Sequence, residues 1–351
     1  MIGGDFQLND ELLKSKSIGK SLQETFKNTN FILTDTGRSA LALALLEIKR
    51  KYSIKKAWLP LFSCHSISHT FSHCGFEINY YGMGSNLNNL NGLPKVINNA
   101  VIFFIHYFGK KNNEMIDFLN DIKDRNQKII IIEDLVHTCL SSQFGEYGDY
   151  SIHSLRKFLP VPDGGILTSR TEVSCNFEEP NENFISYKVL SKLLRGFTEY
   201  DEIYLELEKK GESIIDSKIV PREISNFTKI IFQKININSI QSRRIKNWKE
   251  LNVKIRNNDS LSFTPLFNYL SDGEVPLGFP VLVKGCRDNF RKYLITNNIY
   301  CPIHWELKHI KSNRYYEDVS LSSRILTIPI DQRMGSIEID NFLVIANNYS
   351  L

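Results

Sequence analysis

The segment KIIIIEDLVH, residues 128–137, contains a run of four isoleucines that ends in two acidic side chains. Such a run lacks the alternation of a half-exposed strand and predicts a strand buried on both faces of a sheet. The segment AVIFFIHYFG (100–109) has the same character, and KAWLPLF (56–62) predicts a third strand. Helical patterns flank these strands, at 39–52, 64–74 and 112–126. This alternation predicts an α/β fold with a mostly parallel sheet covered by helices.

The pattern changes in the last third of the chain. Residues 226–256 predict one or two long helices, and strands such as FPVLVKG (279–285) then mix with further helices. This mixture predicts a smaller C-terminal α+β domain. The length of 351 residues suits two domains. We place the large domain at 1–235 and the small domain at 236–351.

Composition limits the function classes. The formal net charge is +4 and no long basic block is present, so the sequence does not indicate nucleic-acid binding. The most apolar stretch, 100–109, is too short to span a bilayer, and the N-terminus lacks the apolar core of a signal peptide. None of the six cysteines forms a C-x-x-C pair, which favours free thiols in a reducing cytoplasm. We expect a cytoplasmic protein without nucleic-acid or membrane partners.

Two predicted element ends carry groups suited to a ligand. The segment LTDTGRSAL (33–41) places Gly37 just ahead of a helix N-terminus, where free N–H groups favour a phosphate. The alternative is a helix that is simply capped by a serine. Asp134 ends a buried strand, where α/β folds usually hold their ligands, although an N-cap is the other interpretation. His137 follows three residues later, within reach of the same site.

A third group lies in GDYSIHSLRK (148–157), where Ser154 and Lys157 have S-x-x-K spacing. This spacing occurs in penicillin-binding-type serine nucleophiles, but the companion signatures of that family are missing. The alternative is a lysine that bonds covalently to a carbonyl group and is activated by a cation such as Arg156. A phosphate cradle, an acid and a lysine together meet the needs of pyridoxal phosphate, with Asp134 holding the ring nitrogen protonated.

The chain resembles the DegT/DnrJ/StrS family of pyridoxal phosphate-dependent sugar aminotransferases, which have the fold-type I architecture. The resemblance runs from about residue 31 to the C-terminus. The matching segments are TDTGRSALALAL (34–45), VIFFIHYFG (101–109), IIEDLVHTCLSS (131–142), FGEYGDYSIHSLRKFLPVPDGGILTS (144–169) and SRRIKNWKEL (242–251).

The resemblance implies a role for each matching residue. Lys157 and Asp134 would be the catalytic residues: Lys157 bonds to the cofactor and moves a proton, and Asp134 pairs with the ring nitrogen. His137 would approach the phenolic oxygen of the ring. Phosphate binding falls on Gly37, Arg38, Ser154 and the amide of Ser39.

The sequence departs from the family pattern at several positions. Two residues are missing between Ser154 and Lys157, and Cys64 or His65 replaces the aromatic residue that stacks on the ring. Asn226, in NFT, corresponds to the family's N-Y-R motif, which reaches the cofactor of the neighbouring subunit and implies a homodimer. His65, His69 and His73 recur every four residues and could hold zinc on a helix, but no acidic residue lies at matching spacing, so we expect no metal.

The family implies a reaction. An amino group would pass from an amino acid such as glutamate to a keto group, on a nucleotide-activated sugar used in polysaccharide or O-antigen biosynthesis. One alternative is a dehydratase or lyase of the same fold, although the dehydratase relatives carry histidine in place of Lys157. The other alternative is a non-catalytic homologue that binds pyridoxal phosphate as a regulator or scaffold.

Overall fold

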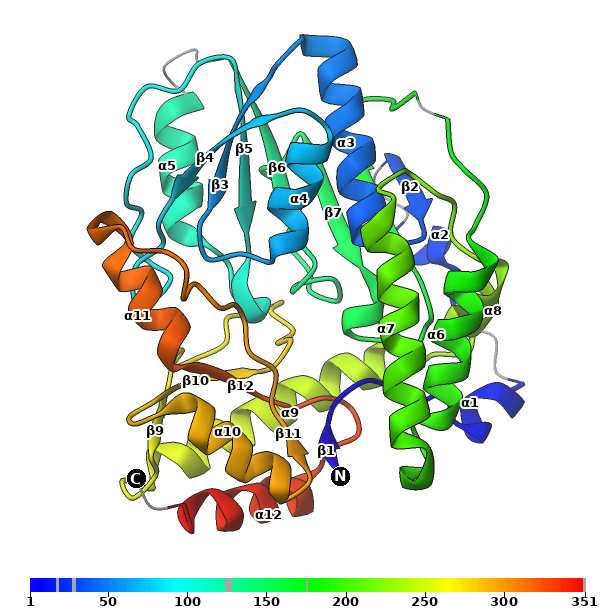
Figure 1. Cartoon of the computed structure of the whole chain (residues 1–351), viewed down its shortest axis with the longest axis vertical. Coiled ribbons are helices and arrows are strands. Elements are labelled where there is room, and N and C mark those ends of the chain that lie inside the picture. The colour runs from blue at the N-terminus through cyan, green and yellow to red at the C-terminus, as the bar shows by residue number, and fades with distance from the viewer. Residues whose placement is uncertain (17–18, 27–29, 124–127, 175, 350–351) are drawn as a thin grey trace.

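A computed structural model describes residues 1–16, 19–26, 30–123, 128–174 and 176–349. Its centre is a seven-stranded sheet in the order β2-β8-β7-β6-β5-β3-β4 (Figure 1). The strands are β2 Asn30–Thr34, β3 Lys56–Pro60, β4 Glu77–Tyr81, β5 Ala100–Ile105, β6 Ile129–Asp134, β7 Tyr150–Ser154 and β8 Gly165–Ser169. Strand β8 runs opposite to the other six strands of this sheet. The predicted mostly parallel sheet is confirmed.

Apolar helices cover this sheet. Helix α3 (Gly37–Tyr52) crosses β7 and β8 and buries the whole stretch 39–45, because alanine and leucine alternate on all its sides. Helix α4 (His65–His73) packs beside α3, and α5 (Asn113–Lys123) connects β5 to β6. Strand β5 is buried at every position, as its unbroken apolar sequence predicts.

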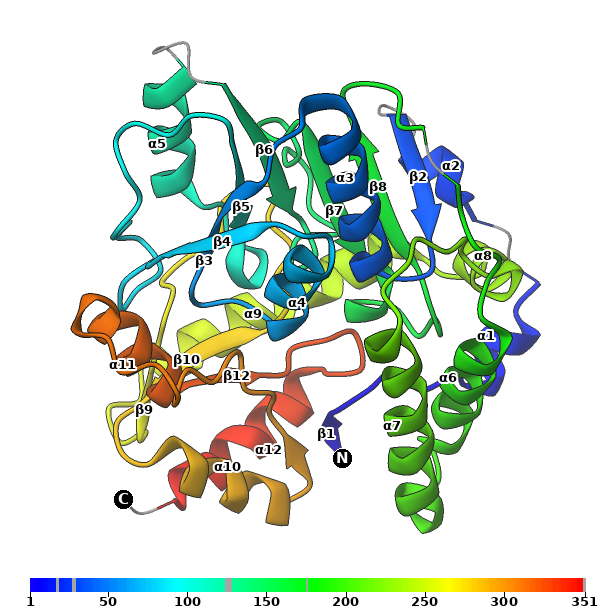
Figure 2. The same cartoon turned by 45° about the horizontal axis from the view of Figure 1, so that its top comes forward.

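The C-terminal part has its own small sheet. Strands β9 (Phe263–Pro265), β10 (Phe279–Val283) and β12 (Ile325–Ile328) pair antiparallel in the order β12-β10-β9. The helices are α9 Ile237–Arg256, α10 Arg287–Thr296, α11 Tyr316–Arg324 and α12 Ser336–Asn347. Aromatic side chains fill the core between them, among them Trp248, Phe263, Phe279, Phe290 and Phe342. Both views show α9 between the seven-stranded sheet and α12 (Figure 1 and Figure 2).

The predicted domain boundary at residue 235 falls in the short link between α8 (Asn226–Gln233) and α9. The first strand, β1 (Ile2–Gly3), pairs with β11 (Ile299–Tyr300) of the C-terminal part. Short helices α1 (Asp10–Lys14) and α2 (Leu22–Thr25) follow β1. Among the helices of the described ranges, none is both long and apolar enough to cross a membrane.

A helical hairpin stands beside the sheet. Helices α6 (Glu182–Leu194) and α7 (Asp201–Ser217) lie side by side in both views, and the C-terminal end of α7 reaches α3 (Figure 1). The link is the Arg38 guanidinium, which donates to the carbonyl of Ile215 at 2.8 Å and to Asp216 at 2.5 Å. The hairpin therefore lies against the N-terminus of α3.

Candidate active site

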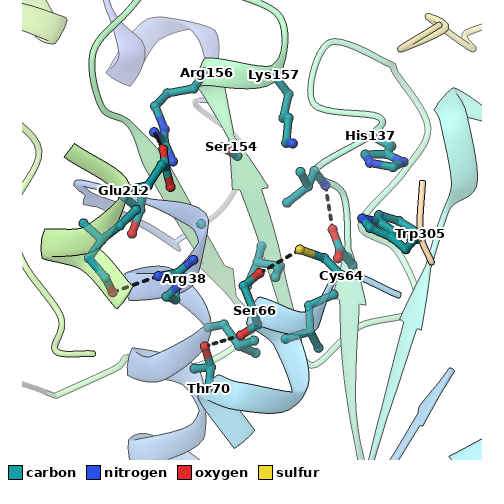
Figure 3. A pocket seen from close by; sticks show the side chains of 18 of the residues that line it. Arg38, Cys64, Ser66, Thr70, His137, Ser154, Arg156, Lys157, Glu212 and Trp305 are labelled. Atoms are coloured by element: carbon teal, nitrogen blue, oxygen red, sulfur yellow. Dashed lines mark hydrogen bonds and ion pairs between the residues drawn. The ribbon is translucent and has the colours of Figure 1, made fainter. Parts of the chain in front are cut away.

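The predicted groups meet at one edge of the large sheet. Strand β6 ends at Asp134, β7 ends at Ser154, and the turn after β2 leads into α3 at Gly37. Because these strands are neighbours or run parallel, their carboxyl ends lie together. They border a cavity of about 320 Å³ (Figure 3). Predicted site residues that line it are Gly37, Arg38, Cys64, Asp134, His137, Ser154 and Lys157.

The N-terminus of α3 forms one end of the cavity. Thr36 is its N-cap, and the Thr36 hydroxyl oxygen accepts the N–H of Ser39 at 3.1 Å. The Ser39 hydroxyl donates to the carbonyl of Val220 at 2.9 Å, so this side chain points away from the cavity. The N–H groups of Gly37 and Arg38 precede the first intrahelical hydrogen bonds and remain at the positive end of the helix dipole.

The Gly-Gly pair that follows Lys157 allows two backbones to approach closely. A side chain at Gly165 would collide with the Thr36 carbonyl. Gly164 adopts a φ of 120° and donates its N–H to the carbonyl of Asp35. Only glycine takes up this combination of left-handed φ and close contact without strain. The pair thus holds β8 against the turn that forms the predicted phosphate cradle.

Asp134 is buried at the floor of the cavity, with 4% of its surface exposed. One carboxylate oxygen accepts the N–H of Val136 at 2.8 Å. Burial raises the pKa of Asp134 to about 7, while this N–H and the Lys157 charge act in the opposite direction. A cation placed against the carboxylate would restore the ordinary charged form.

Lys157 ends a 3₁₀ turn, Leu155–Lys157, that directly follows β7. The turn is fixed by the buried side chain of Leu155, whose N–H donates to Gly164 at 2.9 Å. Figure 3 shows the Lys157 amine extending into the cavity on the side of His137. A single tight turn therefore accommodates the short spacing between Ser154 and Lys157.

His137 is fixed in orientation and in tautomer. Its Nδ1 accepts the N–H of Phe108 at 3.2 Å, so in the neutral ring the proton resides on Nε2. Burial holds the pKa of His137 well below its usual value, and the charges of His304 and Lys157 act in the same direction. The imidazole stacks on Trp305, with ring centroids 5.4 Å apart. His137 therefore offers a neutral N–H donor.

No family model and no curated protein matches the sequence. Solved structures do match over nearly the whole chain. Helicobacter pylori PseC, an aminotransferase involved in the biosynthesis of pseudoaminic acid, has a TM-score of 0.66 at 14% identity, covering 99% of this chain and 100% of PseC. The sugar aminotransferase CalS13 from Micromonospora echinospora has a TM-score of 0.67 at 12% identity, covering 100% of both chains.

An Escherichia coli GDP-4-keto-6-deoxy-D-mannose-3-dehydratase with bound hydrated PLP also matches, with a TM-score of 0.68 at 15% identity over 99% of this chain and 100% of that chain. This chain has the sugar aminotransferase fold. The predicted fold class, an α/β fold of fold type I with a smaller C-terminal part, is therefore confirmed.

Three predicted residues, Ser39, His65 and Asn226, do not line the cavity of this aminotransferase fold. Cys64 does line it and accepts a hydrogen bond from the Ser66 hydroxyl at 3.1 Å, whereas His65 is exposed and stacks on His69 at 5.9 Å. Asn226 is exposed at the start of α8, where its side-chain oxygen accepts from Lys229 at 3.3 Å. Within the described ranges, no cluster of three His, Cys, Asp or Glu side chains could hold a metal ion.

Sequence analysis missed two contributions to the cavity. Trp305 enters from the loop after β11, and no local pattern marks it as a site residue. The hairpin supplies Lys188, Lys192, Glu208 and Glu212. Lys188 and Lys192 are four residues apart on α6, and Glu208 and Glu212 are four residues apart on α7, so each pair lies on one face of its helix. That spacing is a usable signal, although charged faces of this kind usually face solvent.

Proposed function

We propose that this protein is a pyridoxal phosphate-dependent aminotransferase. The observation that carries the proposal is the convergence of three groups on one cavity: the Lys157 amine, the Asp134 carboxylate and the N-terminus of α3. These are an amine for covalent attachment, an acid for the ring nitrogen and donors for the phosphate. The structural neighbours with sugar aminotransferase activity support the same interpretation.

The residues present fit this cofactor. Asp134 is buried without a cation in direct contact among the described residues, which raises its pKa to about 7, and a protonated ring nitrogen would supply the missing charge. At the end of the cavity formed by the N-terminus of α3, the Nε atoms of Arg38 and Arg156 are buried without a partner in the part of the chain that is described. A dianionic phosphate near Gly37 would face these cations and the helix N-terminus.

When bound, pyridoxal phosphate supplies a conjugated ring that withdraws electrons from the carbon bearing the amino group. Lys157 would hold the cofactor through its Nζ. Once a substrate amine takes that place, the free Nζ would accept the proton of the substrate α-carbon and deliver it to the cofactor. Asp134 would keep the ring nitrogen charged, and the Nε2–H of His137 would donate a hydrogen bond to the phenolic oxygen of the ring.

The cofactor would occupy the first cavity, and the substrate would enter from the opposite side of Lys157. A second cavity, of about 350 Å³, shares Asp5, Arg156 and Lys157 with the first and extends to the C-terminal part. Together the two cavities provide room for a cofactor and a substrate. We propose glutamate or a similar amino acid as the donor and a keto group of a nucleotide-activated sugar as the acceptor, in a cytoplasmic homodimer. Polysaccharide or O-antigen biosynthesis is the proposed setting.

One alternative function has specific support. The Escherichia coli dehydratase has the same fold, so a dehydratase or lyase reaction is a second candidate. Lys157 argues against it, because the dehydratase relatives of the family carry histidine at this position. A regulatory or scaffolding role would leave the bound cofactor unchanged by amino donors.

The direct test is to load the protein with pyridoxal phosphate, reduce it with borohydride and map the labelled peptide. We expect a yellow protein and a single label on Lys157. A label on another lysine would contradict the assignment. Adding glutamate should convert the cofactor to its amine form, which separates a transaminase from a scaffold. Sedimentation tests the dimer: an active monomer that retains its cofactor would rule it out.

A further inference from the structure

Arg156 immediately precedes Lys157 in the turn after β7, and the helical hairpin holds its guanidinium. One terminal nitrogen donates to Glu212 of α7 at 2.9 Å, and the guanidinium lies 5.6 Å from the ring centre of the buried Phe184 of α6. The Nε of Arg156 is buried and has no hydrogen-bond partner among the described residues. A buried donor without an acceptor is costly, so an acceptor bound next to this nitrogen would be strongly favoured.

Arg38 is held by the same helix. Its guanidinium donates to the carbonyl of Ile215 and to the carboxylate of Asp216, within about one helical turn of Glu212. Its Nε is also buried without a partner in the described part of the chain. Residues three or four positions apart on a helix lie about 5–6 Å from each other. The C-terminal end of α7 therefore brings the two guanidinium groups together.

The contacts of Gly37 place these two arginines at the N-terminus of α3. A Cβ atom added at Gly37 would lie 3.4 Å from the Cβ of Ser154, so the first turn of α3 abuts the end of β7. Arg38 follows Gly37 directly, and Arg156 follows Ser154 by two residues. Figure 3 shows both arginines on the same side of Ser154. An anion bound at the N-terminus of α3 would therefore lie beside both guanidinium groups.

The charge of Glu212 is balanced by its neighbours. Besides accepting from Arg156, Glu212 contacts Lys188, which also contacts Glu208; both of these lysine contacts are 2.5 Å long. Two positive charges thus face two negative charges in this cluster. Glu212 can therefore direct the guanidinium of Arg156 without presenting an uncompensated negative charge to an anionic ligand.

We propose that Arg156 binds the phosphate of the cofactor through its Nε, and that Glu212 is the positioning residue that orients Arg156 for this contact. This inference rests on the proposed function, because it takes pyridoxal phosphate as the ligand. A guanidinium that is held by a carboxylate at one nitrogen keeps its other N–H groups in a fixed plane, which suits the oxygens of a phosphate. The α6–α7 hairpin thereby sets the geometry of the phosphate site.

The test compares pyridoxal phosphate with pyridoxal, which lacks the phosphate group. Dissociation constants are measured by absorbance for the wild type, Arg156→Met, Glu212→Ala, Glu212→Gln and the double variant Arg156→Met/Glu212→Ala. We expect Arg156→Met to weaken pyridoxal phosphate binding by about 10- to 100-fold, because a charge-assisted hydrogen bond is lost. Its affinity for pyridoxal should change less than about threefold, since pyridoxal has no group at this position.

The Glu212 variants test the positioning role. Glu212→Ala should weaken pyridoxal phosphate binding by roughly 5- to 20-fold, whereas Glu212→Gln retains an acceptor oxygen for Arg156 and should recover most of the affinity. Because Glu212 acts through Arg156, the double variant should bind no more weakly than Arg156→Met alone. The matched control is Glu206→Ala: Glu206 is also ion-paired on α7, with Lys210, but it is exposed and lines neither cavity. This control should bind both probes as the wild type does.

Wild-type affinity for pyridoxal phosphate in Arg156→Met would overturn the phosphate contact, and so would equal losses for both probes. Additive losses in the double variant, or equal losses in Glu212→Ala and Glu212→Gln, would overturn the positioning role of Glu212. In each of these cases a wild-type protein that binds pyridoxal phosphate leaves the proposed function standing. A wild type that does not bind it overturns the proposed function itself. Melting temperatures of the cofactor-free variants verify that each one folds.

Discussion

The imidazole of His137 lies parallel to the indole of Trp305, with ring centroids 5.4 Å apart and planes inclined by 16°. His137 follows β6 of the large sheet, whereas Trp305 lies in the loop after β11. Trp305 is held in turn by Phe62, whose ring packs edge-on against it at 5.3 Å. One face of the candidate active site is therefore completed only when the C-terminal part packs against the large sheet.

We expect Trp305→Ala to lower the rate of the glutamate half-reaction by roughly 3- to 10-fold, because the stacked pair that orients His137 is lost. Trp305→Phe should recover most of the rate, since it retains an aromatic face. The readouts are single-turnover absorbance and the circular dichroism of the bound cofactor. If the alanine and phenylalanine variants behave alike, the stacking does not position His137.

Asp134→Asn tests the mechanism. Asparagine preserves the shape and can still accept the Val136 N–H, so covalent attachment at Lys157 should persist. Conversion by glutamate should slow by at least about 100-fold, because the lost charge stabilises mainly the transition state. Single-turnover absorbance with wild type and variant measures this. A variant that reacts at nearly the wild-type rate would show that Asp134 does not face the ring nitrogen.

The same substitution predicts a pH dependence in the cofactor-free protein. Burial raises the pKa of Asp134 from 3.8 to about 7, so the folded state favours the protonated acid. Protonated Asp134 therefore stabilises the folded state fully below about pH 4, and this stabilisation is lost as the pH rises through about 7. The melting temperature of Asp134→Asn relative to wild type should therefore increase from pH 5 to pH 8, by at least roughly 2 °C. A melting-temperature difference between variant and wild type that stays constant from pH 5 to pH 8 would contradict the raised pKa of Asp134.

Glu133 precedes Asp134 on β6 and is fully buried. Its carboxylate accepts the N–H groups of Gly145 and Gly148, both at 2.9 Å, and lies 2.8 Å from His106 Nε2. In Glu133→Gln, one acceptor oxygen becomes an NH₂ group that faces N–H donors. We expect a loss of about 2–4 kcal/mol in the free energy of unfolding, measured in urea.

The control for Glu133 is Glu114→Gln, on the exposed surface of α5, which should change the unfolding free energy by less than about 0.5 kcal/mol. If the two variants are equally stable, the buried hydrogen bonds of Glu133 contribute nothing to the fold.

The sequence by itself determined the layered α/β fold and the position of Asp134 at the end of a buried strand. Ser154 and Lys157 were singled out by their S-x-x-K spacing and by the family resemblance. Long apolar runs identify buried strands, and the carboxyl ends of neighbouring parallel strands must lie at one edge of the sheet. Polar side chains at those ends could therefore be grouped before any contact was known. The same reasoning located Gly37, because a helix N-terminus follows directly from the chain order of strand and helix.

Only the tertiary structure decided which side chains close the cavity. Cys64 and His65 are consecutive, and the packing of α4 turns the first toward the cavity and the second toward solvent. Trp305 and Lys192 reach the site from segments far away in the sequence. Periodicity shows that the residues of a helix share a face, but it does not show what that face meets. That is fixed by contacts between distant segments, which depend on how the whole chain packs.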